Sequence, residues 1–214
     1  MAEARPLLDD AVLAAAARVI AEHGWHDFTL ERVAQAAGVS RVTLYRRGTT
    51  REQLVDALVV GAAQAWQAAL WPALADPGTA TERLEAALRA CCTVVEEHLA
   101  LLAGLSTAPD PVFHLDEPSA GGGRDTREVF VAPFERLVRD GIAEGGLRAG
   151  LDPAETAVLL FNVVPRTYLH LRSAHGWPAG RTADSLLDLL LAGLRDTTGA
   201  PADHHPHGAT ERNQ

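Results

Sequence analysis

The chain has 214 residues, of which 47% are hydrophobic, and a formal net charge of −9 at pH 7. This length allows one or two domains with a substantial hydrophobic core. All 19 basic residues are arginine, so any contact with a phosphate must come from arginine or from a neutral donor. The sequence carries no nucleotide-binding loop, zinc-hydrolase motif or nucleophile elbow, which argues against the common enzyme classes.

Cysteine usage and hydropathy indicate a cytoplasmic protein with no membrane partner. Cys91 and Cys92 are adjacent, a spacing that rarely forms a structural disulfide, and the first residues are acidic and helical in pattern rather than a signal peptide. Residues 57–75 lack charge but contain Gln64, Gln67 and Pro72. We therefore expect a helix of a soluble protein there rather than a membrane span.

The first 50 residues predict three short helices. Apolar residues recur on one helical face from Leu8 to Ile20, and Thr29 and Ser40 are placed to cap the next two helices. These two helices are about three residues apart, which is the spacing of a helix-turn-helix. The expected helix ends are Gly24, Gly38 and Gly48.

A long fourth helix follows. Thr49 and Glu52 form a T-x-x-E pattern, which predicts a capping box at its start. Its expected apolar face consists of Leu54, Leu58, Ala62, Ala65 and Ala69.

Beyond Gly78 the pattern predicts longer helices separated by one irregular segment. Residues 106–124 are rich in proline, glycine and acid, which predicts a mobile loop. Before this loop, one apolar stripe consists of Leu84, Leu88, Cys91, Cys92, Val95, Leu99 and Leu102.

Three further helices are expected after the loop. Phe130, Phe134, Leu137 and Val138 mark the first, with Pro133 in or at its first turns. Asp152, Pro153 and Glu155 open the second, which we expect to reach about Arg172 and to bend at Pro165. The last is TADSLLDLLLAGLRD, and the polar tail from Thr198 is expected to be disordered.

Four arginines (Arg41, Arg46, Arg47 and Arg51) fall within 11 residues that contain no acid before Glu52. On a helix, Arg41 points away from the apolar Leu44 and would reach a base edge if the helix entered a major groove. The other three would lie beside backbone phosphates. The run therefore predicts a cationic DNA-binding face on an acidic protein, with a solvated arginine-rich turn as the alternative.

Polar groups on the same helix add to this interpretation. Thr43 and Tyr45 also point away from Leu44, and Ser40 can offer its hydroxyl and the free backbone amides of the helix N-terminus to a phosphate. With Arg32 of the preceding helix, these residues complete the predicted contact surface.

Residues 8–58 resemble the DNA-binding domain of the TetR/AcrR family of bacterial transcriptional regulators. The resemblance implies a homodimer that binds a palindromic operator, with a ligand pocket in the C-terminal domain. It also implies phosphate contacts by Thr29, Tyr45, Arg47 and Arg51 and base contacts by Arg41, Val42 and Thr43. The matching elements are Gly24, Phe28-Thr29, Val33-Ala34, Ala37-Gly38-Val39-Ser40, Thr43-Leu44-Tyr45 and Arg51-Glu52.

The chain departs from the family pattern after Arg46, where the family usually shows histidine and then an aromatic residue. Arg47 and Gly48 stand there instead. Arginine is a stronger phosphate partner than neutral histidine. Glycine suits a left-handed helix cap, so a sharper turn is expected.

The last helix is apolar over a wide arc, which predicts two partners, its own core and a second copy of the chain. The alternative is a helix buried within one chain. The residues expected at a dimer interface are Leu186, Leu187, Leu190, Leu191 and Leu194.

Candidate ligand contacts come from the second part of the chain. Aromatic residues concentrate after residue 65, although most aromatics in helical stripes belong to the core. For Cys92 ordinary burial is favoured over thiol sensing, and the histidines of the tail are weak metal candidates. The predicted pocket residues are Trp66, Leu88, Cys92, Phe130, Phe134, Phe161 and Tyr168.

The sequence therefore predicts an all-α protein with a DNA-binding domain over residues 1–50, a ligand-binding and dimerisation domain over residues 51–197 and a tail over residues 198–214. The expected function is a homodimeric repressor released from its operator by a small apolar or amphipathic effector, without cofactor or metal. A ligand-independent DNA-binding regulator and an all-helical enzyme are the alternatives.

Overall fold

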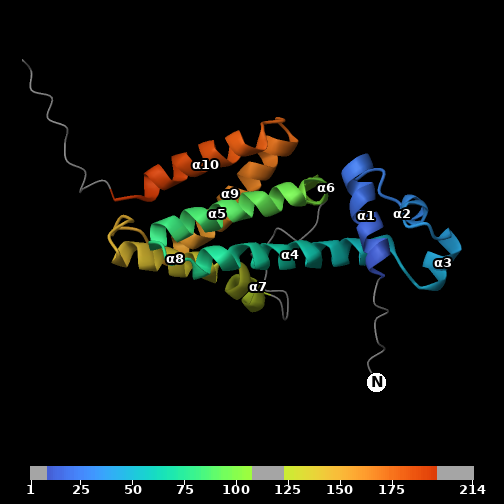
Figure 1. The fold of residues 1–214 in the computed structure, drawn as a ribbon, viewed down its shortest axis with the longest axis horizontal. Helices are drawn as coiled ribbons and strands as arrows, with labels where there is room; N and C mark the ends of the chain where they lie inside the picture. The colour runs from blue at the N-terminus through green and yellow to red at the C-terminus, as the bar shows by residue number, and fades with distance from the viewer. Residues whose placement is uncertain (1–8, 108–122, 197–214) are drawn as a thin grey trace, which may run out of the picture.

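The computed structural model describes residues 9–107 and 123–196, and this part of the chain is all-helical (Figure 1). A small group of helices, α1–α3, lies at one end, and a larger group, α5–α10, lies at the other. The long helix α4 runs along both (Figure 1). The helices are α1 Asp10–His23, α2 Leu30–Ala36, α3 Arg41–Arg46, α4 Arg51–Ala75, α5 Ala80–Glu97, α6 Leu99–Thr107, α7 Gly123–Phe130, α8 Ala132–Ala143, α9 Pro153–Ser173 and α10 Ala179–Leu194.

Side-chain caps set the helix starts of the small domain. Thr29 Oγ1 accepts a hydrogen bond from the Arg32 amide, and Ser40 Oγ accepts one from the Thr43 amide. Each bond satisfies one amide that lacks a partner in the first turn. The predicted capping box at Thr49 and Glu52 is wrong by one residue, because Thr50 and Gln53 form it. Thr49 is buried instead.

The apolar residues form two cores. In the small domain, α1, α2 and α3 pack around residues that include Phe28 and Leu44, and this core also takes Leu54 from α4 and Leu101 and Leu105 from α6. The larger core lies among α4, α5, α8, α9 and α10. Since Leu54 is fully buried in the first core, the start of α4 belongs physically to the small domain. The domain boundary at residue 50 stays a prediction.

Two predicted helices are divided in the structure. The apolar stripe that runs past Val95 is broken at His98, where α5 ends and α6 begins. Phe130 is the last residue of α7 rather than a member of α8, and Pro133 lies in the first turn of α8. The predicted loop over 106–124 is also too long, because its first two and last two residues are helical. The rest of that loop lies outside the described residues.

Hydrogen bonds connect elements of the larger domain near the start and near the end of α9. The amide of Arg148 donates to the carbonyl of Leu194, which ties the turn after α8 to the end of α10. At the other end Glu96 accepts from Tyr168 and from Arg172, with 2.5 Å between Arg172 Nη2 and Glu96 Oε1. The Arg172 guanidinium is the main reason that the pKa of Glu96 lies below its usual value. These bonds join α5 to α9, and α10 to the turn between α8 and α9.

Helix α4 is long and apolar enough, by length and composition alone, to cross a membrane. In the structure it packs lengthwise against α5. Leu54 at its start is buried in the small core, and Trp66 and Leu70 further along are buried in the larger one. These buried residues of α4 therefore join the two domains, while Val60 and Trp71 on the same helix are exposed.

Candidate nucleic-acid interface and ligand cavity

Helix α3 lies at the outer end of the small domain (Figure 1). Leu44 is its one buried residue and anchors the helix in the small core. Val42 and Tyr45 are exposed at 65% and 56%, unusually high for large apolar side chains. An exposed helix with arginine, threonine and apolar side chains matches what is needed to meet phosphates, base edges and thymine methyl groups.

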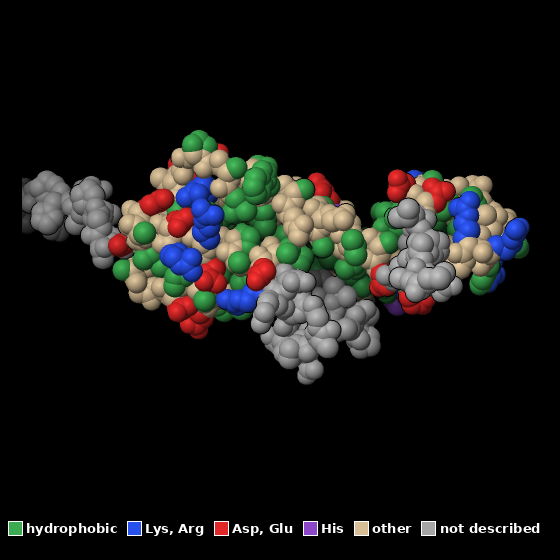
Figure 2. Space-filling view, turned by 90° about the horizontal axis from the view of Figure 1, so that it is seen from below, with side chains coloured by type: hydrophobic (Ala, Val, Ile, Leu, Met, Phe, Trp, Pro, Cys, Tyr) green, Lys and Arg blue, Asp and Glu red, His purple; other side chains and the backbone are tan. Residues whose placement is uncertain are grey.

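Figure 2 shows arginine side chains at this end of the molecule, with acidic side chains beside them. Arg41 Nη2 donates to the hydroxyl of Tyr45 at 3.2 Å, and its guanidinium carbon lies 5.3 Å from the centre of the Tyr45 ring. Arg41 Nη1 also lies 3.8 Å from Glu31 Oε2. Tyr45 therefore positions Arg41 along the surface of α3 in the free protein.

Two more predicted DNA contacts have acidic neighbours. Arg47 Nη1 lies 3.5 Å from Asp9 Oδ2, and Arg32 Nη2 lies 3.7 Å from Asp27 Oδ1. These acids come from other segments, so the run of residues without acid in the sequence is not free of acid in space. The exposed pairs are individually weak.

Arg51 differs from the other arginines because it is half-buried. Its Nε donates to the carbonyl of Phe28 at 3.1 Å, and its guanidinium lies 4.7 Å from the Trp25 ring centre and 5.4 Å from that of Phe28. These contacts join the start of α4 to the turn before α2. Arg51 thus has a structural role that the sequence did not reveal, and its phosphate contact stays a prediction.

The serine and threonine hydroxyls of the candidate interface take part in helix-cap hydrogen bonds. Ser40 Oγ, besides accepting from the Thr43 amide, lies 2.8 Å from Thr43 Oγ1. Gly48 follows α3 at φ +68°, in the left-handed region where other residues are strained. The turn between α3 and α4 therefore uses the glycine that departs from the family pattern. Arg46, the last residue of α3, is exposed beside this turn.

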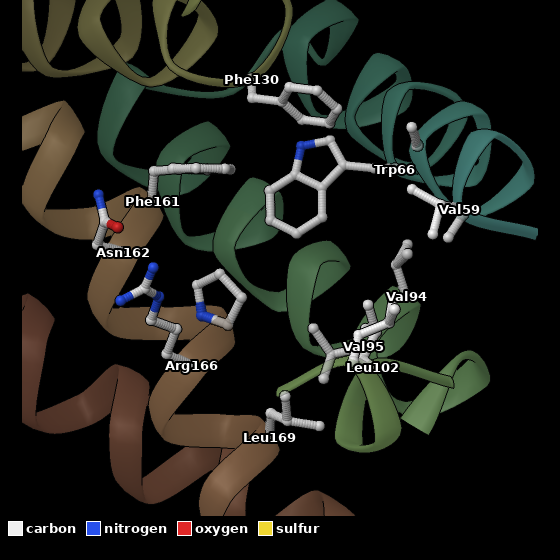
Figure 3. A pocket seen from close by; sticks show the side chains of 14 residues that line it. Val59, Trp66, Val94, Val95, Leu102, Phe130, Phe161, Asn162, Arg166 and Leu169 are labelled. Atoms are coloured by element: carbon white, nitrogen blue, oxygen red, sulfur yellow. The ribbon is translucent and has the colours of Figure 1, made fainter. Parts of the chain in front are cut away.

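A cavity of about 250 Å³ opens in the larger domain among α4, α5, α6 and α9, with the end of α7 beside it. Its walls are mostly apolar. Figure 3 shows Trp66 with Phe130 and Phe161 at one side, and Asn162 and Arg166 along one edge on α9. The lining residues are Val59, Ala62, Ala63, Trp66, Val94, Val95, Leu102, Leu105, Phe130, Phe161, Asn162, Pro165, Arg166 and Leu169.

The three aromatic residues of the cavity form a cluster. The Trp66 ring centre lies 6.1 Å from that of Phe130 and 5.7 Å from that of Phe161, both in edge-to-face arrangements. Trp66 Nε1 is buried without a hydrogen-bond partner among the described residues. Such a donor costs free energy unless an acceptor or an aromatic face approaches it.

Three of the seven predicted pocket residues, Trp66, Phe130 and Phe161, line this cavity. Leu88, Cys92, Phe134 and Tyr168 do not, because they are buried in the larger core. The Tyr168 hydroxyl donates to Glu96 at 3.0 Å, and burial together with this carboxylate raises the pKa of Tyr168 to about 12.

Sequence reasoning missed two features of the cavity. The first is the polar pair Asn162 and Arg166, which the i, i+4 spacing on one helix places together. The second is α6, whose Leu102 and Leu105 line the cavity, because the sequence stripe gave no sign that the helix turns at His98.

The predicted interface leucines mostly turn inward. Leu186, Leu187 and Leu191 are buried in the core of the same chain, and Leu190 and Leu194 are partly buried against it. The wide apolar arc of α10 is therefore explained in part by the core of its own chain, and a dimer contact by these leucines stays a prediction. The large apolar side chains exposed on α9 and α10 are Val158, Leu159 and Leu189.

The comparisons with known proteins agree with this architecture. Residues 12–58 match the family model of bacterial regulatory proteins of the tetR family. The fatty acid metabolism regulator protein of Bacillus subtilis (strain 168) is 22% identical over 190 residues, which is 86% of this chain and 94% of that protein.

Solved structures share the fold over nearly the whole chain. The ketosteroid transcriptional regulator KstR2 of Mycobacterium tuberculosis has a TM-score of 0.68 at 21% identity, covering 90% of this chain and 98% of its own. FadR from Bacillus subtilis in complex with stearoyl-CoA has a TM-score of 0.57 at 21% identity, covering 86% and 98%. The helix-turn-helix followed by a helical domain defines a DNA-binding transcriptional regulator rather than an enzyme. The chain belongs to the TetR/AcrR family.

Proposed function

We propose that the protein is a homodimeric cytoplasmic repressor that leaves a palindromic operator when a small molecule fills the cavity among α4, α5, α6 and α9. The observation that carries this proposal is the position of Leu105. This side chain lines the cavity and is also buried in the core of the small domain. A ligand that displaces Leu105 therefore acts directly on the packing of the helices that present α3.

Helix α6 supports this coupling in a second way. Gly104 lies so close to Trp25 that a Cβ at position 104 would stand 2.4 Å from the indole. The same Trp25 contacts Arg51 at the start of α4. A shift of α6 would thus be passed to the turn before α2 and to α4 together, which changes the separation of the two recognition helices in a dimer.

The predicted DNA contacts remain Thr29, Arg32, Ser40, Arg41, Val42, Thr43, Tyr45, Arg46, Arg47 and Arg51. For the dimer, the exposed apolar side chains Val158, Leu159 and Leu189 on α9 and α10 are the surface that a second copy would cover.

The test begins with DNA fragments that the protein retains from the genome that encodes it. Binding of the retained sequence would be followed by fluorescence anisotropy, while candidate small molecules are added to wild type and to Leu105→Ala. We expect a palindromic sequence, release by a ligand in wild type, and a changed ligand dependence in Leu105→Ala. Sequence-specific binding that no cavity-binding molecule alters would instead support a ligand-independent regulator.

A further inference from the structure

The cavity separates an apolar interior from a polar edge. Aliphatic and aromatic side chains form nearly all of its wall, while Asn162 and Arg166 stand together on α9 (Figure 3). Arg166 is exposed and Asn162 is half-buried, so this polar edge meets solvent. The side-chain amide of Asn162 donates to the carbonyl of Val158 at 2.8 Å, which fixes its orientation. A ligand that matches the cavity has an apolar body and a polar end at α9.

The charge at this edge determines which polar headgroup a ligand of the cavity would carry. Arg166 is the ionisable residue among those that line the cavity. A guanidinium can pair with a carboxylate through two parallel hydrogen bonds. Because Arg166 is exposed, the carboxylate would remain partly hydrated and the cost of removing it from water would be small. A ligand with several phosphates would bring more negative charge than this one cation can balance.

The volume limits the apolar body. An apolar protein cavity of about 150 Å³ holds one benzene molecule, which has six carbons, so a cavity of about 250 Å³ holds roughly eight to ten non-hydrogen atoms. A stearoyl chain has 18 carbons and would need roughly twice that space by the same estimate. The cavity of this chain is therefore smaller than an acyl chain of the length carried by the stearoyl-CoA in the Bacillus subtilis FadR structure.

From these three observations we infer that the effector is a small monocarboxylic acid. Its apolar body has about eight non-hydrogen atoms and lies against Trp66, Phe130 and Phe161, and its carboxylate pairs with Arg166. This inference rests on the proposed function, because it names the ligand class of the same cavity.

The test measures binding without DNA, on the full chain, by isothermal titration calorimetry. The probes are hexanoate, octanoate, decanoate, stearate and stearoyl-CoA, together with neutral octanol as the match for octanoate. We expect affinity to be highest near octanoate and about threefold to fivefold lower for octanol, since Arg166 is exposed and an exposed charge pair contributes less than a buried one. Tighter binding of stearate or stearoyl-CoA, equal binding of octanol, or no binding of any acid would overturn the inference.

Two variants locate the headgroup. Arg166→Gln should weaken octanoate binding about threefold to fivefold and leave octanol binding unchanged. Arg136→Gln is the matched control, because Arg136 is an exposed arginine on α8 outside the cavity. An unchanged dissociation constant of octanoate in Arg166→Gln would show that the carboxylate does not contact Arg166. Quenching of indole fluorescence by octanoate should also disappear in Trp66→Phe, and its persistence there would place the acid elsewhere.

Failure of the ligand class can be told apart from failure of the proposed function. If octanoate binds as described but the protein stays bound to its operator, the proposed release mechanism is wrong and the ligand class is still supported. If a neutral or much larger molecule causes release through the same cavity, the ligand class fails while the function stands.

Discussion

Gly104 of α6 and Trp25 of the turn after α1 are in direct contact, and the contact exists only because position 104 has no side chain. A Cβ placed there would lie 2.4, 2.5 and 2.6 Å from three atoms of the indole. Trp25 also stacks on Phe28, with 6.1 Å between ring centres. Besides the side chains of Leu101 and Leu105, the backbone of α6 thus contacts the DNA-binding domain at Trp25.

Gly104→Ala should force α6 away from Trp25. We expect the free energy of unfolding to fall by about 1–3 kcal/mol, the usual range for overpacking, and ligand and DNA binding to become less strongly coupled. Adding Trp25→Leu should recover part of the loss, which a double-mutant cycle would measure by chemical denaturation. Gly61→Ala is the control, because this exposed helical glycine has open space around it and should become slightly more stable. Additive effects of Gly104→Ala and Trp25→Leu would show that the contact carries no coupling.

Leu159→Glu combined with Leu189→Glu should produce monomers. Both side chains are exposed, at 57% and 75%, so the charges cost little in one chain but would be buried without partners in a dimer. The molar mass is measured by light scattering and the fold by circular dichroism. Val60→Glu, at a comparably exposed site on α4, should leave the mass unchanged. If the double variant keeps the wild-type mass, the interface lies on another surface.

Sequence and structure agree best where local chemistry decides. The caps at Thr29 and Ser40 and the glycine turn at Gly48 follow from short-range hydrogen bonds and backbone sterics, so the helix-turn-helix could be read directly. The pattern could not show that α6 turns at His98 to join the small domain, because burial in either core requires the same apolar residues.

The sites were less predictable than the fold for the same reason. An apolar side chain at Phe134 or at Phe161 looks alike in sequence, and only the packing leaves one in the core and the other beside a cavity. Long-range pairs such as Arg47 with Asp9 are equally invisible to a local pattern.

Arg46→Ala should reduce the salt dependence of DNA binding. The side chain is exposed at the end of α3, where a flanking phosphate is expected. Loss of one phosphate contact in each half-site lowers the slope of log affinity against log salt by about one unit per half-site. Anisotropy titrations between low and moderate salt measure this slope, with Arg136→Ala as the control on α8. Equal slopes for Arg46→Ala and wild type would place Arg46 outside the interface.

The Arg41→Ala and Arg51→Ala variants should change DNA binding in different ways. Loss of Arg41, which lies against Tyr45 on the exposed face of α3, should relax preference at one or two operator positions, each by about 1–3 kcal/mol. Loss of Arg51 removes its bond to the Phe28 carbonyl and its contact with Trp25, so stability should fall by about 1–2 kcal/mol while affinity weakens alike for all sequences.

A binding selection on randomised operators, paired with denaturant unfolding, separates the two effects. The same sequence preference in both variants would show that Arg41 holds a phosphate instead of reading a base.

The thiols of Cys91 and Cys92 should be inert in the folded protein. Both are buried, and burial raises the pKa of Cys92 to about 11 and that of Cys91 well above its usual value. The reactive thiolate is therefore scarce at pH 7 and increases only as the pH approaches 11. Ellman's reagent should react slowly with native protein and rapidly, with two thiols, in denaturant. Fast labelling of native protein at pH 7 would revive a thiol-sensing role.

The acids beside the DNA-binding arginines turn operator binding into an exchange of partners. Asp9, Asp27 and Glu31 stand close to Arg47, Arg32 and Arg41 before any DNA arrives, so the free protein presents little net positive charge at close range. The closely spaced phosphates of DNA can displace these carboxylates from the arginines. A polyanion with widely spaced charges would gain too little binding free energy to displace them. The acids would thus act as a threshold that rejects weak competitors in a crowded cell, and they would do so without contacting a single base.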